Sequence, residues 1–179
     1  NDVPEEVMDK NLDHFIPIGY TEEELAYAGK FKEVVTELDK EGLKDMIAHV
    51  VEKDKRKEVL DMPLLDFKLD RSESYGGGGS TDVGDVSWCI PTAQINTSTF
   101  PAQAPGHSWQ NVSCGRTSIA HKNMLLAGKV IAATAIDLME KPEVLQAAKD
   151  EFNKKMKRYG GYTCPVPQGA VPVIPGEKM

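Results

Sequence analysis

A stretch of 44 residues, 72–115, contains neither lysine nor arginine, and it limits how this chain of 179 residues can fold. Residues 1–71 before it hold 11 basic and 19 acidic side chains, a net charge of −8. Helices that face solvent normally carry lysine and glutamate, so we expect the middle segment to be irregular or buried. A long irregular segment inside a compact domain is usually functional or disordered.

Apolar periodicity predicts helices on both sides of this segment. Thr21 and Glu24 have the spacing of a capping box, so a helix is expected over 21–39. The residues of 117–139 are apolar almost all round, which predicts a helix buried between other elements. Similar patterns predict helices over 41–55 and 142–157, short strands over 64–69 and 89–95, and an extended tail over 159–179.

Composition excludes several classes of protein. The length corresponds to roughly one domain, so we treat 1–179 as a single unit. The net charge of −7 argues against a nucleic-acid binder or an anionic-membrane binder. No apolar run approaches the ~18 residues of a membrane span. The three cysteines form no CxxC pair, which favours free thiols and a cytoplasmic protein.

The middle segment holds the candidate chemical groups. The run Gly76–Ser80 is either an engineered linker or a native glycine-rich loop. Asp82 and Asp85 offer oxygens to a cation or an amine, although an Asp-x-x-Asp pair is more often a capped turn. His107 stands in a loop, free of helical constraint. His121 stands near a predicted helix N-terminus, which favours neutral imidazole and suits a ligand, a donor or a packed core histidine.

Five strings in this sequence resemble the carboxy-terminal part of M20-family metallopeptidases. The branch that they resemble is the aminobenzoyl-glutamate utilization protein B amidohydrolases. The most specific string is GSTDVGDVSW, and it favours a native glycine run. The strings are GSTDVGDVSW (79–88), PGHSW (105–109), AHKNM (120–124), GGYTCPVP (160–167) and YTEEE (20–24).

The resemblance implies a fold and an activity. The fold is α/β, part of a three-layer sandwich with a central mostly parallel sheet. The activity is hydrolysis of the amide bond of N-acyl amino acids, such as p-aminobenzoyl-glutamate, by two divalent ions, Zn or Mn. Residues 72–115 would supply active-site loops and a strand, with Ser80, Thr81, Asp82 and Asp85 binding substrate. His107 would be a metal ligand, with His121 as the alternative.

The sequence departs from the family pattern in one respect. It has no His-x-Asp motif and no Glu-Glu pair beside metal ligands, so no catalytic residue is expected in this chain. We therefore expect an inactive carboxy-terminal portion of a catalytic domain. Its partners would be the amino-terminal half of that domain and a lid or dimerization domain, within a homodimer. The alternative is a non-catalytic binding or assembly module of the same fold.

Overall fold

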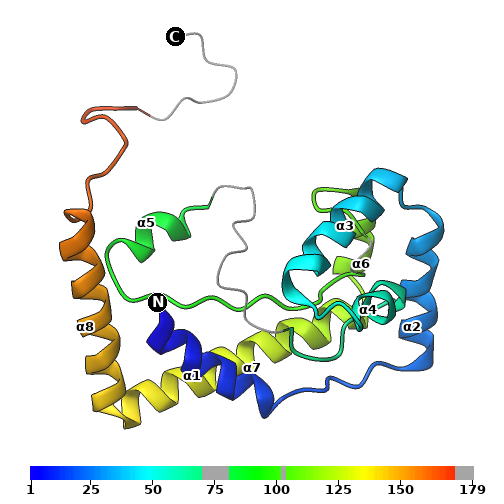
Figure 1. Cartoon of the computed structure of the whole chain (residues 1–179), viewed down its shortest axis with the longest axis horizontal. Helices are drawn as coiled ribbons and strands as arrows, with labels where there is room; N and C mark the ends of the chain where they lie inside the picture. The colour runs from blue at the N-terminus through cyan, green and yellow to red at the C-terminus, as the bar shows by residue number, and fades with distance from the viewer. Residues whose placement is uncertain (70–80, 102–103, 172–179) are drawn as a thin grey trace.

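The computed structural model describes residues 1–69, 81–101 and 104–171, and these are mostly helical. The longest helix, α7 (Ser118–Glu140), forms a spine along which α1 (Asp2–Asp13) lies (Figure 1). At one end of α7 stand α8 (Pro142–Tyr159) and α5 (Val83–Ser87). Near the other end lie α2 (Glu22–Gly29), α3 (Glu37–Val50), α4 (Arg56–Asp61) and α6 (Trp109–Gly115).

The two long helices confirm the predictions made for 117–139 and 142–157. Pro142 occupies the first turn of α8, where its missing N–H costs nothing. Gly160 ends α8 with a φ of 81°, a left-handed conformation that glycine adopts without strain. Glu151 of α8 also accepts hydrogen bonds from the backbone N–H groups of Asp2 and Val3, at 2.9 and 3.0 Å. This carboxylate therefore caps the first turn of α1 from a distant part of the chain.

The single helix predicted over 21–39 is wrong, because the chain breaks into three pieces there. Helix α2 passes into a 3-10 turn, η1 (Lys30–Glu33), and α3 then begins at Glu37. The break follows from a second capping box, in which Thr36 Oγ accepts from the Asp39 N–H at 3.2 Å and Asp39 accepts from the Thr36 N–H at 3.0 Å. The capping box predicted at Thr21 is confirmed.

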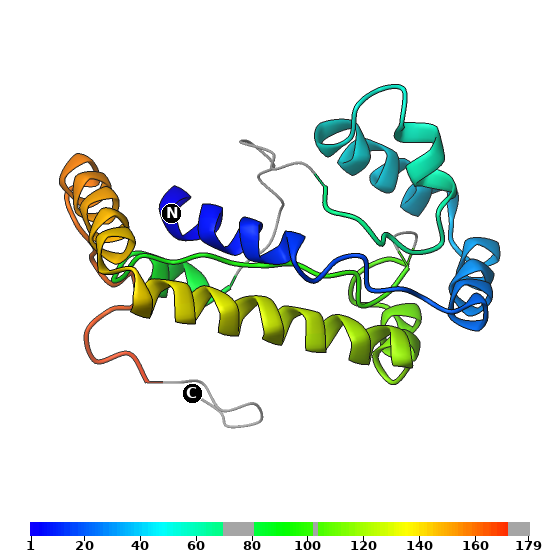
Figure 2. The ribbon, with the colours of Figure 1, turned by 90° about the horizontal axis from the view of Figure 1, so that it is seen from below.

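The predicted central, mostly parallel sheet is wrong: the described ranges contain no strand. Residues 64–69 are irregular with bends at Leu64 and Phe67, and Cys89 and Ile90 form the turn that follows α5, so neither predicted strand forms. A parallel ladder needs a neighbouring strand, and both segments have helices beside them. Leu64, at the start of the predicted strand over 64–69, is buried against Ala28 of α2 and Ile119 of α7, so helices cover this apolar side chain. Residues 91–98 run alongside α1 and α7 (Figure 1 and Figure 2), and Thr92 exchanges hydrogen bonds with Asn1 at the start of α1.

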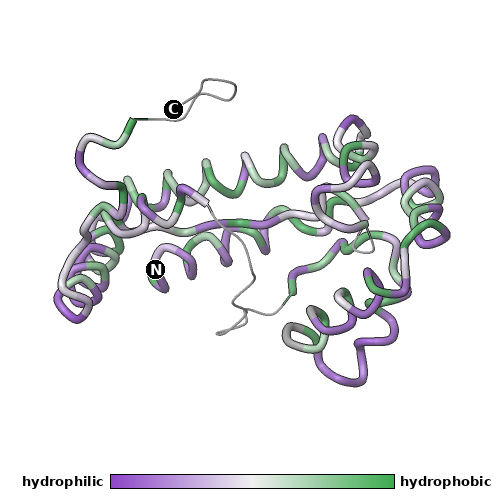
Figure 3. Tube along the Cα trace, turned by 90° about the horizontal axis from the view of Figure 1, so that it is seen from above, coloured by the Kyte–Doolittle hydropathy of each residue, from purple (hydrophilic) through white to green (hydrophobic). Residues whose placement is uncertain are grey.

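One face of α7 is buried and the opposite face is exposed, so the expectation of burial all round is wrong for half of this helix. Ile119, Leu126 and Val130 face the interior. The outward face carries large apolar side chains that are at least half exposed, and the hydrophobic colouring along α7 is seen in Figure 3. We call this outward set the α7 stripe: Met124, Leu125, Ile131, Ile136 and Met139. No helix within the described part of the chain has both the length and the hydropathy to cross a membrane.

Candidate functional site

The carboxylates predicted to bind substrate lie on and beside a short helix, α5. Asp82 precedes its first residue and caps no backbone group with its side chain. Thr81 Oγ accepts a hydrogen bond from the Val83 N–H at 3.3 Å, which holds the turn into the helix. Asp82 and Asp85 are both exposed to solvent. Ser80 and the glycine run before it lie outside the described residues.

The chain beyond α8 folds back onto α5. The Tyr162 hydroxyl donates a hydrogen bond to Asp85 Oδ1 at 2.8 Å, and this bond raises the pKa of Tyr162. The Trp88 ring lies 6.0 Å from the Tyr159 ring in an edge-to-face arrangement and 6.5 Å from the Tyr162 ring. Such aromatic contacts contribute about 0.5–1.5 kcal/mol beyond area burial. Tyr162 thus holds the chain beyond α8 to α5 and Trp88 by one hydrogen bond and one ring contact, and the second ring contact joins Trp88 to Tyr159 at the end of α8.

These contacts form an open groove of about 410 Å³, which we call the α5 groove. Thr81, Asp85, Trp88, Tyr162 and Thr163 are among its lining residues. A carboxylate beside aromatic faces suits a ligand that carries hydrogen-bond donors or positive charge. Trp88 and Tyr162 were missed as site residues, although both stand in the strings quoted above.

The structure places His107 far from the α5 groove. His107 is exposed, has a φ of 54°, and stands just before α6, which lies towards the opposite end of α7 from α5 (Figure 1). Ser108 fixes this turn: its Oγ donates to the Pro105 carbonyl at 2.5 Å and accepts from the Asn111 N–H at 3.2 Å. The short helix α6 therefore begins with a side-chain cap immediately after His107.

His121 is also exposed, on the second turn of α7. The interpretation of His121 as a packed core histidine is therefore wrong, because its side chain lies on the outward side of the helix. Within 1–69, 81–101 and 104–171 no three histidine, cysteine or carboxylate side chains gather as metal ligands. The described residues do not fit a complete metal centre, since a catalytic zinc takes three protein ligands.

The chain was compared with known families, solved structures and curated proteins. No protein-family model and no solved structure matches it. It is 36% identical over 175 residues to one subunit, designated B, of p-aminobenzoyl-glutamate hydrolase from Escherichia coli (strain K12). The match covers 94% of this chain and 36% of that protein.

Xaa-Arg dipeptidase is a second curated relative. The human protein is 30% identical over 93 residues and the mouse protein 29% over 97, each match covering 52% of this chain and 21% of the dipeptidase. The chain thus spans little more than a third of the hydrolase polypeptide. The resemblance to the aminobenzoyl-glutamate branch is confirmed: this chain is similar over nearly its whole length to a p-aminobenzoyl-glutamate hydrolase polypeptide.

Proposed function

We propose that this chain is the carboxy-terminal portion of a metal-dependent amidohydrolase of the M20 type. The identity of 36% over 94% of the chain to the E. coli p-aminobenzoyl-glutamate hydrolase polypeptide carries this proposal. The reaction is hydrolysis of the amide bond of an N-acyl amino acid, and p-aminobenzoyl-glutamate is the candidate substrate. We further propose that the whole enzyme works in the cytoplasm, in keeping with free thiols at all three cysteines.

In this proposal the chain binds substrate and contributes one metal ligand. Asp85 and Tyr162 in the α5 groove offer an acceptor and a hydroxyl to the polar groups of an amide substrate. His107 is the proposed ligand, because its loop leaves the imidazole exposed, with His121 as the alternative. Two divalent ions, Zn or Mn, would polarise the amide and lower the pKa of water. The general base and the remaining ligands must come from another segment, so this chain alone is inactive.

The α7 stripe supports packing against further polypeptide. Monomeric proteins rarely leave a long contiguous apolar face in water, and large exposed patches commonly mark interaction sites. Met124 and Met139, with Ile131 between them, lie 15 residues apart on one helix face, or about 22 Å at the rise of an α-helix. We propose that the amino-terminal half of the same catalytic domain covers this stripe, and that a lid or dimerization domain completes a homodimer.

The second candidate function is a non-catalytic binding or assembly module. The observation that favours it is the lack of any three-ligand metal cluster in the part of the chain that the structure describes. An assay of the chain with Zn or Mn and p-aminobenzoyl-glutamate gives no turnover under either proposal. Turnover well above that of the metal alone would refute the claim that the chain is inactive by itself.

A chimera distinguishes the two candidates. The matching segment of the E. coli hydrolase polypeptide is replaced by this chain, and the chimera is assayed for amide hydrolysis and metal content. Under the hydrolase proposal the chimera is active. The change His107→Ala then lowers turnover by orders of magnitude and removes metal at an unchanged melting temperature, while the matched control His121→Ala retains both. A folded chimera without activity favours the assembly module, and loss of metal in His121→Ala alone reverses the ligand assignment.

A further inference from the structure

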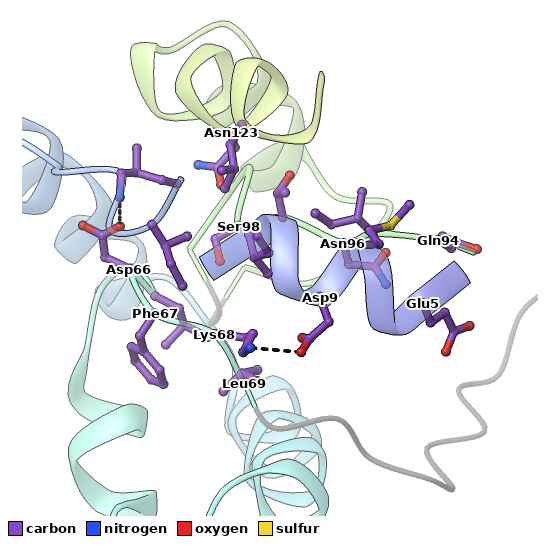
Figure 4. A pocket seen from close by; sticks show the side chains of 18 residues that line it. Glu5, Asp9, Asp66, Phe67, Lys68, Leu69, Gln94, Asn96, Ser98 and Asn123 are labelled. Atoms are coloured by element: carbon purple, nitrogen blue, oxygen red, sulfur yellow. Dashed lines mark hydrogen bonds and ion pairs between the residues drawn. The ribbon is translucent and has the colours of Figure 1, made fainter. Parts of the chain in front are cut away.

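Two cavities among the described residues differ in whether their charges are paired within the chain. One, of about 360 Å³, lies between α1 and α7 and includes Lys68 in its wall (Figure 4). The Lys68 ammonium is bound there by the carboxylates of Asp9 at 3.0 Å and Asp13 at 2.8 Å, so opposite charges already meet. The other cavity is the α5 groove. Among the described residues that line it, Asp85 alone carries a charge.

The Asp85 carboxylate keeps acceptor capacity for a ligand. Tyr162 donates its hydroxyl to Oδ1 at 2.8 Å, and no described residue donates a hydrogen bond to Oδ2. A carboxylate has about four acceptor sites, so most of them stay open in an exposed side chain. Asp82, three residues earlier and also exposed, adds a second negative charge at this end of α5. These charges repel an anionic group from the groove and attract a cationic one.

Aromatic rings beside this carboxylate favour an organic cation. Trp88 is 36% exposed and Tyr162 is 37% exposed, so a ligand can reach both rings from solvent. The negative face of an aromatic ring attracts ammonium and guanidinium groups. One cation already lies on a ring of this cluster: the Arg158 guanidinium is 5.6 Å from the centroid of Tyr159, whose ring contacts Trp88. Arg158 does not line the groove itself, so the groove is open to a further cation.

A metal ion suits this groove less well than an organic cation. Divalent ions such as Ca²⁺ and Mg²⁺ take several oxygen ligands, whereas the described wall of the groove offers one carboxylate. No three histidine, cysteine or carboxylate side chains gather as metal ligands in the described ranges. An organic cation needs fewer direct bonds, because ring faces supply part of the attraction.

We propose that the α5 groove binds an ammonium or guanidinium group of a small organic molecule, held against the Asp85 carboxylate and the rings of Trp88 and Tyr162. The N–H groups of the cation are donated to Oδ2 of Asp85, as charge-assisted hydrogen bonds. That the bound molecule is the amide substrate rests on the proposed function. In that case the groove takes the end of the substrate that is remote from its carboxylates.

Benzylammonium, benzyl alcohol and benzoate are matched probes, because they share a ring and are cationic, neutral and anionic at neutral pH. The full chain is titrated with each at low salt, and the indole N–H signals of its two tryptophans are followed by NMR. Trp109, towards the opposite end of α7, is the internal control (Figure 1). We expect benzylammonium to shift the Trp88 signal and to bind about tenfold more tightly than benzyl alcohol, with benzoate the weakest. Equal affinities of benzylammonium and either other probe, or no saturable shift at Trp88, would overturn the proposal.

The change Asp85→Asn then tests whether this carboxylate selects the charge. Asparagine keeps an oxygen that can accept from Tyr162 but removes the negative charge. The matched control is Asp45→Asn, which removes an exposed carboxylate from α3, near the opposite end of α7 (Figure 1). In the first variant the affinity for benzylammonium should fall towards that for benzyl alcohol, and in the second it should stay unchanged. A preference for benzylammonium that survives undiminished in a folded Asp85→Asn chain refutes the site.

This proposal and the proposed function fail independently. The titrations measure binding to the chain alone, so a folded chimera without amide hydrolysis does not alter their result. Conversely, loss of the charge preference leaves the activity of the chimera as the test of the hydrolase proposal. The comparison of the three probes on the unchanged chain also needs no variant, so it decides the question even where Asp85→Asn fails to fold.

Discussion

The carboxylate of Glu24 joins α2 to α7, and its removal tests how much this junction contributes to stability. Glu24 is buried, and it accepts hydrogen bonds from Ser118 Oγ at 2.5 Å, Lys122 Nζ at 2.7 Å and the Thr21 N–H at 2.8 Å. Burial opposes ionisation, but hydrogen bonds from Lys122, Ser118 and Thr21 outweigh it and lower the pKa of Glu24 from 4.5 to about 2. The folded state therefore stabilises the ionised carboxylate of Glu24 relative to its protonated form.

The size of the effect follows from this pKa. A displacement of the pKa from 4.5 to about 2 corresponds to at most about 3.4 kcal/mol of stabilisation. Lys122 is partly exposed, so solvent screens the pair, and we expect Glu24→Gln to lower the free energy of unfolding by about 1–2 kcal/mol at pH 7. A depressed carboxyl pKa stabilises the fold above the unfolded value of about 4.5. The contribution is lost as the pH falls towards 2.

Urea unfolding followed by far-ultraviolet circular dichroism measures this loss at pH 7 and at steps down to about pH 2.5. The matched control is Glu23→Gln, which removes a carboxylate from the same helical turn at an exposed position. The difference between the original chain and Glu24→Gln should shrink as the pH falls below 4.5, whereas the control should differ little at any pH. A constant difference across the range, or equal losses in both variants, would refute this account of the junction.

Three further outcomes are expected. The change Ile119→Ala should cost about 2–4 kcal/mol in urea unfolding because it opens a cavity in the core, whereas exposed Ile131→Ala on the same helix should cost under ~0.5 kcal/mol. Burial opposes ionisation of Glu151, but hydrogen bonds, of which that from Lys155 is the largest, lower its pKa to about 2. Glu151→Gln should therefore lower the free energy of unfolding by about 1 kcal/mol at pH 7 and by less below pH 4.5. A loss of stability that does not change with pH contradicts this. Calorimetry should find weak zinc binding by the chain, and stoichiometric submicromolar binding would contradict the incomplete site.

The long helices were predictable from the sequence because local signals agree there. In α7 and α8, apolar periodicity, Pro142 and Gly160 all indicate the same boundaries. The helix predicted over 21–39 failed where a local signal was overlooked, since Thr36 and Asp39 have capping-box spacing. A capping box involves residues within about four positions of one another, so a helix start of this kind can be predicted from the sequence alone.

The sheet and the site depend on contacts between distant residues, which local patterns do not contain. An apolar run such as 64–69 fits a strand pattern equally well whether helices or strands cover it. Asp85 was predicted as a binding residue, but its partner Tyr162 lies 77 residues further along the chain. His107 was predicted from its loop and a family resemblance, neither of which specifies what surrounds it in space.

The surface of the middle segment connects these findings. The absence of lysine and arginine was interpreted as irregular or buried structure, yet α5 and α6 are helices with exposed apolar side chains. On α6, Trp109 is 62% exposed and Val112 is 78% exposed. The side chains of the α7 stripe are exposed to a similar extent. A helix without charged side chains, such as α6, is poorly suited to water but well suited to an interface, whose core is depleted of charged residues. The same composition that argued against a solvated helix therefore supports the proposal that further polypeptide packs on this part of the chain.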